Sequence, residues 1–259
     1  MRGILYVELS VRTMTTDAHS GGASALPNAA WRLHAALASL KGPDERVRIR
    51  GFYDAVTPPS RVDQQLLDAR PAPDALLRKQ FGIARFVRDA RGRALNEAVF
   101  EPTCNIAGFG AGHTGKGLKT IIPAQAAAKL DFRLVPDQDP EHVFAQLRAH
   151  LDAEGFSDVE VKKLGQMWPA KADGDDPFVR LTASAAESVY GKPSAIAPLV
   201  GGSSPVYAFA RPLGGIPVVT AGVGYWDNRT HAPDEHVRLD DLLNGARHIA
   251  RIVNGFGAL

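Results

Sequence analysis

The sequence predicts a mixed α+β / α/β fold, in which an antiparallel sheet with helices on one face precedes a shorter α/β part. Three observations lead to this prediction. Strand-like and helix-like hydrophobic periods alternate along residues 3–165. Proline, glycine and acidic residues interrupt the pattern at 165–176. Beyond this linker, helical periods flank one short apolar run, which suits a sheet edge covered on both faces. We therefore expect one domain at 3–165 and another at 170–259.

The first half of the first domain is predicted to form a strand, a helix and a strand. Alternating side chains predict a strand over residues 4–14. Apolar positions at helical spacing predict a helix over 27–40, which a Gly-Pro pair stops. A short apolar run predicts a strand over 47–53. Prolines then punctuate a polar helical segment that continues to about residue 98.

The second half of this domain is predicted to form a hairpin, a helix and a closing strand. Residues 103–109 and 121–134 have strand patterns, and the glycine-rich turn between them favours a hairpin. Residues 140–151 have a helical pattern, and 159–164 a strand pattern. These elements give an antiparallel sheet with helices on one face.

The second domain is predicted to contain three helices and one strand. A helix over residues 178–190 should end at a glycine, and a short helix should cover 203–209. The apolar run at 216–221 predicts a buried strand, and 239–256 the final helix.

Composition and charge exclude several classes of function. The chain has 259 residues, 45% of them hydrophobic, which is enough for packed cores. Its formal charge is only +2 without a long basic run, so no nucleic-acid footprint is expected. The apolar runs are too short for a membrane span or a signal peptide, which predicts a cytoplasmic protein without membrane partners. The single cysteine, Cys104, excludes an internal disulfide, and its apolar surroundings favour a buried structural thiol.

The loop over residues 222–235 carries the first indication of chemistry. It is rich in glycine, follows an apolar run and contains His231-Ala-Pro. Taken alone, such a histidine is more often a polar loop residue than a metal ligand. Four further motifs precede it along the chain: Asp17-Ala-His19-Ser-Gly-Gly22, Lys119-Thr120-Ile-Ile-Pro123, Asp131-Phe-Arg133-Leu-Val-Pro136 and Gly201-Gly-Ser203-Ser-Pro205.

Together the five motifs resemble metallopeptidase family 20, the carnosinase and aminoacylase type, and most closely its dipeptidase branch. The resemblance extends from Gly3 to Phe256. It implies a lid or dimerisation domain, with a four-stranded antiparallel sheet and two helices on one face, at 3–165. Residues 170–259 would be the C-terminal part of an α/β catalytic domain. It further implies a site for two divalent metals, expected to be zinc, a homodimer formed through the lid, and peptide or N-acyl amino acid substrates.

The resemblance also implies a role for one residue of each motif. His231 would be the terminal imidazole ligand of one metal. His19 would reach across the dimer into the neighbouring active site to stabilise the oxyanion, and Thr120 would make a second contact in trans. Arg133 would bind the terminal carboxylate of the substrate. Ser203 would offer its hydroxyl and backbone amides at a helix start as an anion cradle.

Plainer alternatives exist for two of these residues, and one position departs from the family. His19 could be a strand-end histidine capped by Ser20. Arg133 could be an arginine on the solvated face of the sheet. Val200 stands where the dipeptidase pattern often has an acidic residue before Gly-Gly-Ser, which weakens the expectation of a grip on a free α-amino group.

Most metal ligands of the family pattern are missing from this sequence. Family members open with a longer segment that carries His-x-Asp, Glu-Glu and a further acidic ligand, and no Glu-Glu pair occurs here. His150 and Asp152 spell His-x-Asp, but they lie in a predicted helix, where residues two apart point to different sides. We therefore interpret His150 as a solvated helix-end residue.

Two rival motifs fail on inspection. Residues 110–117 satisfy Gly-x-Gly-x-x-Gly, but Gly117 stands where a phosphate loop needs Ser or Thr, and a β-branched segment follows instead of a helix. The segment around Ser203 lacks the glycine two residues later that a hydrolase nucleophile elbow requires.

Two hypotheses of different class remain. In the first, the chain works as a dipeptidase-like metallohydrolase when a separate N-terminal polypeptide, or a gene start upstream of Met1, supplies the missing ligands. In the second, it is a non-catalytic, self-associating lid module. Both depend on a common cleft lined by Arg133 and His231, and metal titration separates them.

Overall fold

The computed structural model describes residues 1–257, which form two compact units. The first unit consists of Met1–Pro58, Ala72–Pro169 and Val200–Tyr207. The second consists of Pro59–Pro71, Ala170–Leu199 and the chain from Ala208 onward.

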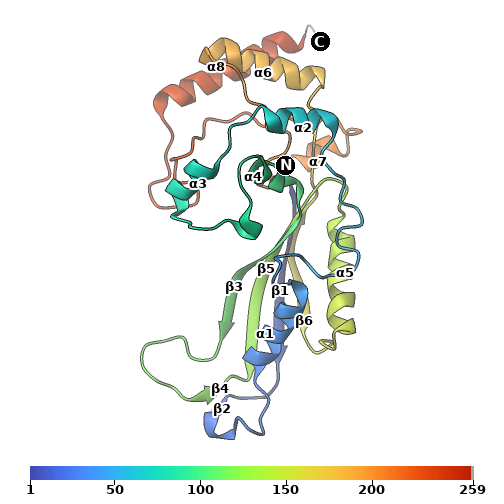
Figure 1. Cartoon of the computed structure of the whole chain (residues 1–259), viewed down its shortest axis with the longest axis vertical. Coiled ribbons are helices and arrows are strands. Elements are labelled where there is room, and N and C mark those ends of the chain that lie inside the picture. Colours follow the sequence, from blue (N-terminus) through green and yellow to red (C-terminus); the bar gives the residue numbers. More distant parts are fainter. Residues whose placement is uncertain (258–259) are drawn as a thin grey trace. The chain divides into compact units, whose positions relative to one another are not determined.

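A four-stranded antiparallel sheet organises the first unit, as predicted (Figure 1). Strand β1 (Gly3–Arg12) lies between β5 (Gln125–Leu134) and β6 (Glu160–Met167), and β3 (Thr103–Ala111) pairs with the other side of β5. Strands β3 and β6 are therefore the edges.

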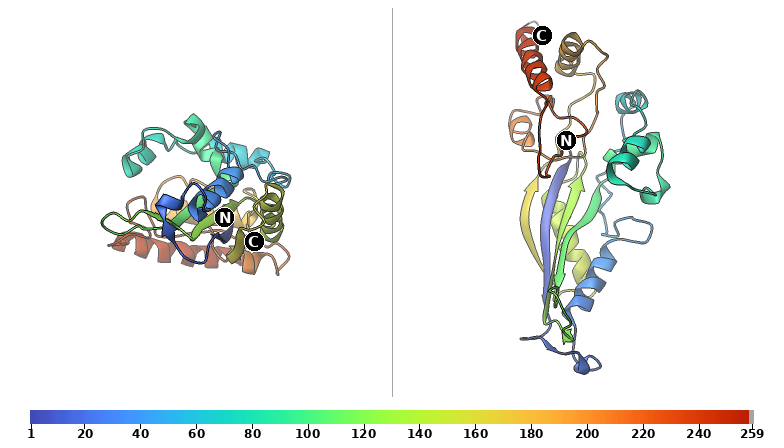
Figure 2. Two further views of the ribbon diagram at one scale, coloured as in Figure 1. Left: turned by 90° about the horizontal axis from the view of Figure 1, so that it is seen from below. Right: turned by 90° about the vertical axis from the view of Figure 1, so that its left-hand side faces the viewer.

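Two helices cover one face of this sheet, which confirms the predicted arrangement (Figure 2). Helix α1 (Ala29–Leu40) and helix α5 (Pro140–Ala153) share one hydrophobic core with the alternate, inward-facing side chains of β1 and β5. Full burial of each large aliphatic side chain contributes about 1.5–3 kcal/mol. The buried strand residues include Leu5, Val7, Leu9, Val11, Ala126, Ala128, Leu130, Phe132 and Leu134.

The segment after α1 does not form the predicted strand over 47–53. Val47 makes only an isolated bridge with Lys41, and the amide of Phe52 donates to the carbonyl of Ile49 at 3.1 Å in a turn. Gly51 lies in this turn with φ of +78°, which glycine adopts at little cost. The apolar residues are nevertheless buried, because the run packs onto the core without pairing as a strand.

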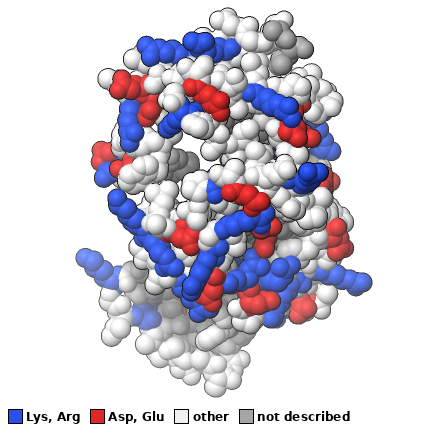
Figure 3. All heavy atoms as spheres, turned by 45° about the horizontal axis from the view of Figure 1, so that its top comes forward, with Lys and Arg blue, Asp and Glu red and all other residues white. Residues whose placement is uncertain are grey.

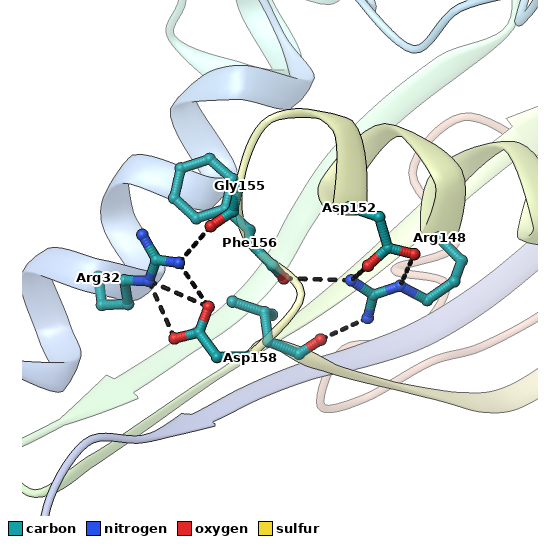
Figure 4. Close-up of polar contacts among 7 residues, drawn as sticks. Arg32, Arg148, Asp152, Gly155, Phe156 and Asp158 are labelled. Atoms are coloured by element: carbon teal, nitrogen blue, oxygen red, sulfur yellow. Dashed lines mark hydrogen bonds and ion pairs between the residues drawn. The ribbon is translucent and has the colours of Figure 1, made fainter.

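Two arginines tie the loop after α5 to the helices (Figure 4). From α1, the Arg32 Nε donates to both carboxylate oxygens of Asp158, at 3.2 and 3.0 Å. This hydrogen bond lowers the pKa of Asp158. From α5, the Arg148 Nη2 donates to Asp152 Oδ1 at 2.7 Å and to the carbonyl of Phe156 at 3.1 Å. The loop is thus held from both helices that cover the sheet.

The interpretation of His150 as a solvated residue is wrong. Its side chain is buried, and its Nε2 lies 3.1 Å from the hydroxyl of Ser39 on α1. Helix α5 places this position against α1, so that the imidazole joins the two helices. Asp152 contacts Arg148 instead, so the two residues face different neighbours, as the helical geometry predicts.

A short ribbon extends one end of the sheet. Strand β2 (Ala18–His19) pairs with β4 (Ile121–Ile122), beside the end of β1 and the start of β5. The predicted strand over 121–134 is therefore interrupted between β4 and β5. The carboxylate of Asp17 accepts a hydrogen bond from the amide of Ala124 at 2.9 Å, which fixes this break.

The polar segment before β3 is helical, as predicted, but it is shared between the units. Helix α2 (Arg61–Asp68) belongs to the second unit, whereas α3 (Asp74–Phe81) and α4 (Arg93–Glu97) belong to the first. Ser60 begins α2 with a capping box in which Asp63 is the reciprocal partner.

The second unit is built on two packed helices, both of which were predicted. Helix α6 (Pro177–Tyr190) ends at Gly191, whose left-handed φ of 63° is a common helix C-cap. It packs along α8 (Leu239–Phe256). Buried His248 of α8 donates from Nε2 to the carbonyl of Thr182 on α6 at 2.9 Å.

Two smaller elements that were predicted within residues 170–259 differ from prediction. The run at 216–221 is not a strand: it has irregular structure, and its side chains are partly exposed. The sequence supplies a strand-like apolar run, but no described strand of this unit pairs with it. The short helix predicted at 203–209 begins later, as α7 (Tyr207–Ala210).

The surface carries charged side chains of both signs. Lys and Arg are interspersed with Asp and Glu on the face drawn in Figure 3, so no single-sign charge field dominates it.

Among residues 1–257, no helix has both the length and the apolar composition needed to cross a membrane.

Candidate functional site

Arg133 and Ser203, which were predicted separately, are hydrogen-bonded to each other. The Arg133 Nη1 donates to Ser203 Oγ at 2.9 Å, although the residues are 70 positions apart. The Ser203 hydroxyl in turn donates to the carbonyl of Gly3 at 3.1 Å. Both residues belong to the first unit, where Val200–Tyr207 lies against the start of β1.

Strand geometry places an acidic partner beside Arg133. Asp131 and Arg133 are two residues apart on β5, so they face the same, open side of the sheet. Asp131 Oδ1 lies 3.5 Å from Arg133 Nε. On the neighbouring strand β3, Asn105 is directly opposite Asp131, and its side-chain amide donates to Asp131 Oδ2 at 2.8 Å.

A second arginine, Arg2, lies buried beside this group and was missed by the sequence analysis. Its Nη2 donates to the carbonyl of Glu101 at 2.6 Å and to that of Arg133 at 3.2 Å. Its backbone amide donates to the carbonyls of Val200 and Gly202. Burial first, and then the nearby charge of Arg133, lower its pKa to about 10. Arg2 thus joins the ends of β3 and β5 to the segment that carries Ser203. We call Arg2, Asn105, Asp131, Arg133 and Ser203 the Arg133 cluster.

The predicted anion cradle at Ser203 is not formed as expected. Ser203 does not begin a helix, because α7 starts only at Tyr207 and has four residues. Its hydroxyl is also engaged as a donor to Gly3. The structure therefore gives Ser203 the position of a residue that holds Arg133.

His19 and Thr120 form a second pair, on the β2–β4 ribbon. The His19 Nδ1 accepts a hydrogen bond from the amide of Gly21 at 3.0 Å, which leaves Nε2 directed toward Thr120 Oγ1 at 3.4 Å. The amide of Ser20 donates to the Thr120 carbonyl at 3.1 Å. Both side chains are exposed, as a contact with another molecule would require.

The β2–β4 ribbon and the end of β5 that carries Arg133 lie at opposite ends of the four-stranded sheet (Figure 1). Strand β5 runs from Gln125, next to the ribbon, to Leu134, next to Arg133. Because a strand advances about 3.3 Å per residue, Gln125 and Arg133 are separated by roughly 26 Å. A single copy of this unit therefore cannot bring His19 and Arg133 to one small substrate.

His231, the predicted metal ligand, lies in an exposed loop of the second unit. Its φ is 65°, and its backbone amide donates to Glu235 Oε2 at 3.3 Å. Its sharing of a cleft with Arg133 stays a prediction, because the two residues belong to different units.

The residues present do not fit a two-metal site. Within residues 1–257, no three His, Cys, Asp or Glu side chains converge in a way that could hold a metal ion. His231 offers one imidazole, whereas zinc sites in proteins use three or four protein ligands. The described side chains alone therefore do not supply the ligands that a two-metal mechanism needs.

Cys104 is a structural thiol, as predicted. It lies on β3 facing the core, and burial raises its pKa to about 12. A thiol that stays protonated at neutral pH is a poor nucleophile.

Comparison with known proteins identifies the family. A model described as the peptidase dimerisation domain of the M20 family matches residues 1–159. The Cys-Gly metallodipeptidase of Candida albicans is 24% identical over 99% of this chain and 54% of its own length. The corresponding protein of Schizosaccharomyces pombe is 26% identical over 95% of this chain and 53% of its own length.

Solved structures agree on the fold. An M20 family metallo-carboxypeptidase from Sulfolobus solfataricus is 34% identical, with a TM-score of 0.94, over 100% of this chain and 59% of that chain. Human carnosine dipeptidase 1 is 23% identical with a TM-score of 0.83, over 100% of this chain and 56% of that chain. The chain thus spans about half the length of the curated relatives it matches. The dimerisation-domain match covers more than half of the residues of this chain, and the chain therefore belongs to metallopeptidase family 20.

Proposed function

We propose that this chain is the lid and the C-terminal catalytic portion of a dipeptidase-like metallohydrolase, with the lid at residues 3–165 and the catalytic portion at 170–259. The observation that carries the proposal is the hydrogen bond between Arg133 and Ser203. It joins two of the family-like motifs in one polar group on the open face of the lid. The similarity to Cys-Gly metallodipeptidases supports the same reaction class.

In this proposal, Arg133 binds the free carboxylate of a peptide or an N-acyl amino acid. The Arg133 side chain is 34% exposed, so a ligand can reach it. Contacts to Asp131 and Ser203 hold the guanidinium in one orientation. A planar guanidinium held in this way offers parallel N–H donors that match the two oxygens of a carboxylate.

We further propose a homodimer formed through the lid, in which His19 and Thr120 act on the site of the partner copy. The separation of the two groups within one unit supports an action in trans. Strand β3 is an edge of the sheet, and its Ile106 and Phe109 are each 51% exposed. An edge strand with exposed apolar side chains favours pairing with another sheet.

Hydrolysis in this proposal requires metal ligands beyond His231. Two divalent metals, expected to be zinc, would supply an activated water and an electrophile for the amide carbonyl. The apolar face of α8 supports the need for additional polypeptide, since a contiguous exposed apolar surface is typical of an interface. Its exposed residues are Leu239, Leu242, Leu243, Ile249, Val253 and Phe256. We also propose a cytoplasmic location, which fits the single cysteine.

A metal and dipeptide titration tests this function. We expect the purified chain to bind zinc weakly, through single imidazoles, and not to hydrolyse Cys-Gly. It should nevertheless bind the dipeptide through the carboxylate of the dipeptide. Arg133→Ala should therefore abolish the binding of Cys-Gly, and the wild-type chain should not bind Cys-Gly amide, which lacks the carboxylate. Two tightly held zinc ions, or binding that ignores the Arg133 substitution, would contradict the proposal.

The alternative function is a non-catalytic dimerisation module. It is favoured by the lack of a metal-binding group among residues 1–257. The two functions differ in ligand binding: a dimerisation module self-associates but has no carboxylate site at Arg133. Because both functions include self-association, the dipeptide titration is the measurement that separates them.

A further inference from the structure

We infer that Asp131 determines the charge of the ligand that Arg133 accepts, so that the site takes a single carboxylate and discriminates against dianions. This inference rests on the proposed role of Arg133 as a carboxylate-binding residue. Nothing in the five sequence motifs assigned a function to Asp131 or to its neighbour Asn105.

The charges of the Arg133 cluster do not cancel. Arg2 and Arg133 contribute two positive charges, and Asp131 contributes one negative charge. Glu101 is also close to Arg2, but its carboxylate is paired with Arg88. Two positive charges and one negative charge leave one uncompensated positive charge at this end of the sheet.

The residues of β1 that lie opposite Asp131 and Arg133 do not change this balance. The next charged residues lie farther along this face, where Glu8 on β1 is opposite both Lys129 on β5 and Lys162 on β6. Tyr6 lies opposite Asp131, and Ile4 opposite Arg133. The surroundings on β1 therefore add no net charge beside the guanidinium.

Contacts with Asp131 and Ser203 set the orientation of the N–H donors of Arg133. The Asn105 amide occupies Asp131 Oδ2, which leaves Oδ1 to face the Arg133 Nε. Ser203 takes one N–H of Nη1. A guanidinium has five N–H donors, so one on Nη1 and two on Nη2 remain beyond these contacts. Neighbouring donors on Nη1 and Nη2 suit one bidentate carboxylate.

A second negative charge on the ligand would meet Asp131. The Asp131 side chain is only 14% exposed, so water screens it less than a surface carboxylate. A monocarboxylate neutralises the remaining positive charge, whereas a dianion makes the group net negative. Arg2 cannot be approached in its place, because it is buried under the ends of β3 and β5.

The test compares acetate with malonate at neutral pH and constant ionic strength. Binding to the 259-residue chain is followed by NMR at the Nε–Hε signal of Arg133, which Arg133→Lys identifies. We expect the wild-type protein to bind acetate more tightly than malonate. Asp131→Asn should shift the preference toward malonate by roughly tenfold, the equivalent of about 1.4 kcal/mol. Asp175→Asn, which removes an exposed carboxylate of the second unit, should leave the preference unchanged.

Further variants keep the test decisive if Asp131→Asn does not fold. Asn105→Asp adds a negative charge to the same group and should weaken malonate binding more than acetate binding. Asn105→Ala keeps the charge and should retain the preference for acetate. Acetate binding with an acetate-to-malonate preference that neither charge variant changes would overturn the inference alone. Failure of both anions to perturb Arg133 would overturn the proposed function and the inference together.

Discussion

The two units of this protein bury their apolar residues to different extents. In the first unit, one face of the sheet and two helices enclose a single core, and Leu130 at its centre is fully buried. In the second unit, α6 and α8 pack together, but α8 still exposes a row of large apolar side chains, among them Leu243 at 56%. The first unit has the core of an independent domain, whereas the second leaves an apolar helix face exposed, a feature that is typical of interfaces.

The largest expected effect contrasts these two leucines. Leu130→Ala should lower the free energy of unfolding by about 3 kcal/mol, because it removes buried methyl groups and leaves a cavity. Leu243→Ala should change it by less than about 0.5 kcal/mol, because the side chain is half exposed and alanine favours a helix. Urea unfolding of both variants measures the difference. Equal losses would contradict the contrast between the units.

An intermediate effect is expected at Arg2, which belongs to the first unit. Arg2→Met keeps an unbranched stem but removes the donors to the carbonyls of Glu101 and Arg133, which should cost about 1–2 kcal/mol. Thermal unfolding measures this loss. The Arg133 Nε–Hε signal should also broaden or shift, since the lost guanidinium donates to the backbone carbonyl of Arg133. If the variant is as stable as the wild-type protein and the signal is unchanged, the Arg2 side chain does not position Arg133.

The smallest effect is electrostatic and depends on pH. Hydrogen bonding to Arg32 lowers the pKa of Asp158, so the stabilisation is present above the unfolded-state pKa, near 3.9, and is lost as the pH falls through the folded-state pKa. Because both side chains are at least one-third exposed, solvent screening limits the effect of Asp158→Asn to about 0.5–1 kcal/mol at pH 7.

Unfolding at a series of pH values checks this sign. The difference between Asp158→Asn and the wild-type protein should shrink toward zero under strongly acidic conditions and decrease in high salt. Asp175→Asn, in the more exposed ion pair with Arg180 of the second unit, should cause no measurable loss. A constant difference at all pH values would mean that the substitution acts through packing.

The accuracy of the sequence predictions followed the length of the pattern. The helices over 140–151, 178–190 and 239–256 were confirmed, because each long amphipathic period has one way to bury its apolar side. The apolar runs at 47–53 and 216–221 were wrongly predicted as strands. A short apolar run predicts only that its side chains are buried. Whether it pairs as a strand depends on a partner strand that is remote in sequence.

Apart from the run at 47–53, the sequence by itself determined the main strands and helices of the first unit. It also drew attention to His19, Thr120, Arg133, Ser203 and His231 through short motifs. Only the tertiary structure decided which of these residues meet. It joined Arg133 to Ser203 and His19 to Thr120, and it added Arg2, Asn105 and Asp131. The physical reason is that local periodicity specifies which side of an element a residue faces. Cross-strand register and the return of a distant segment specify what it touches.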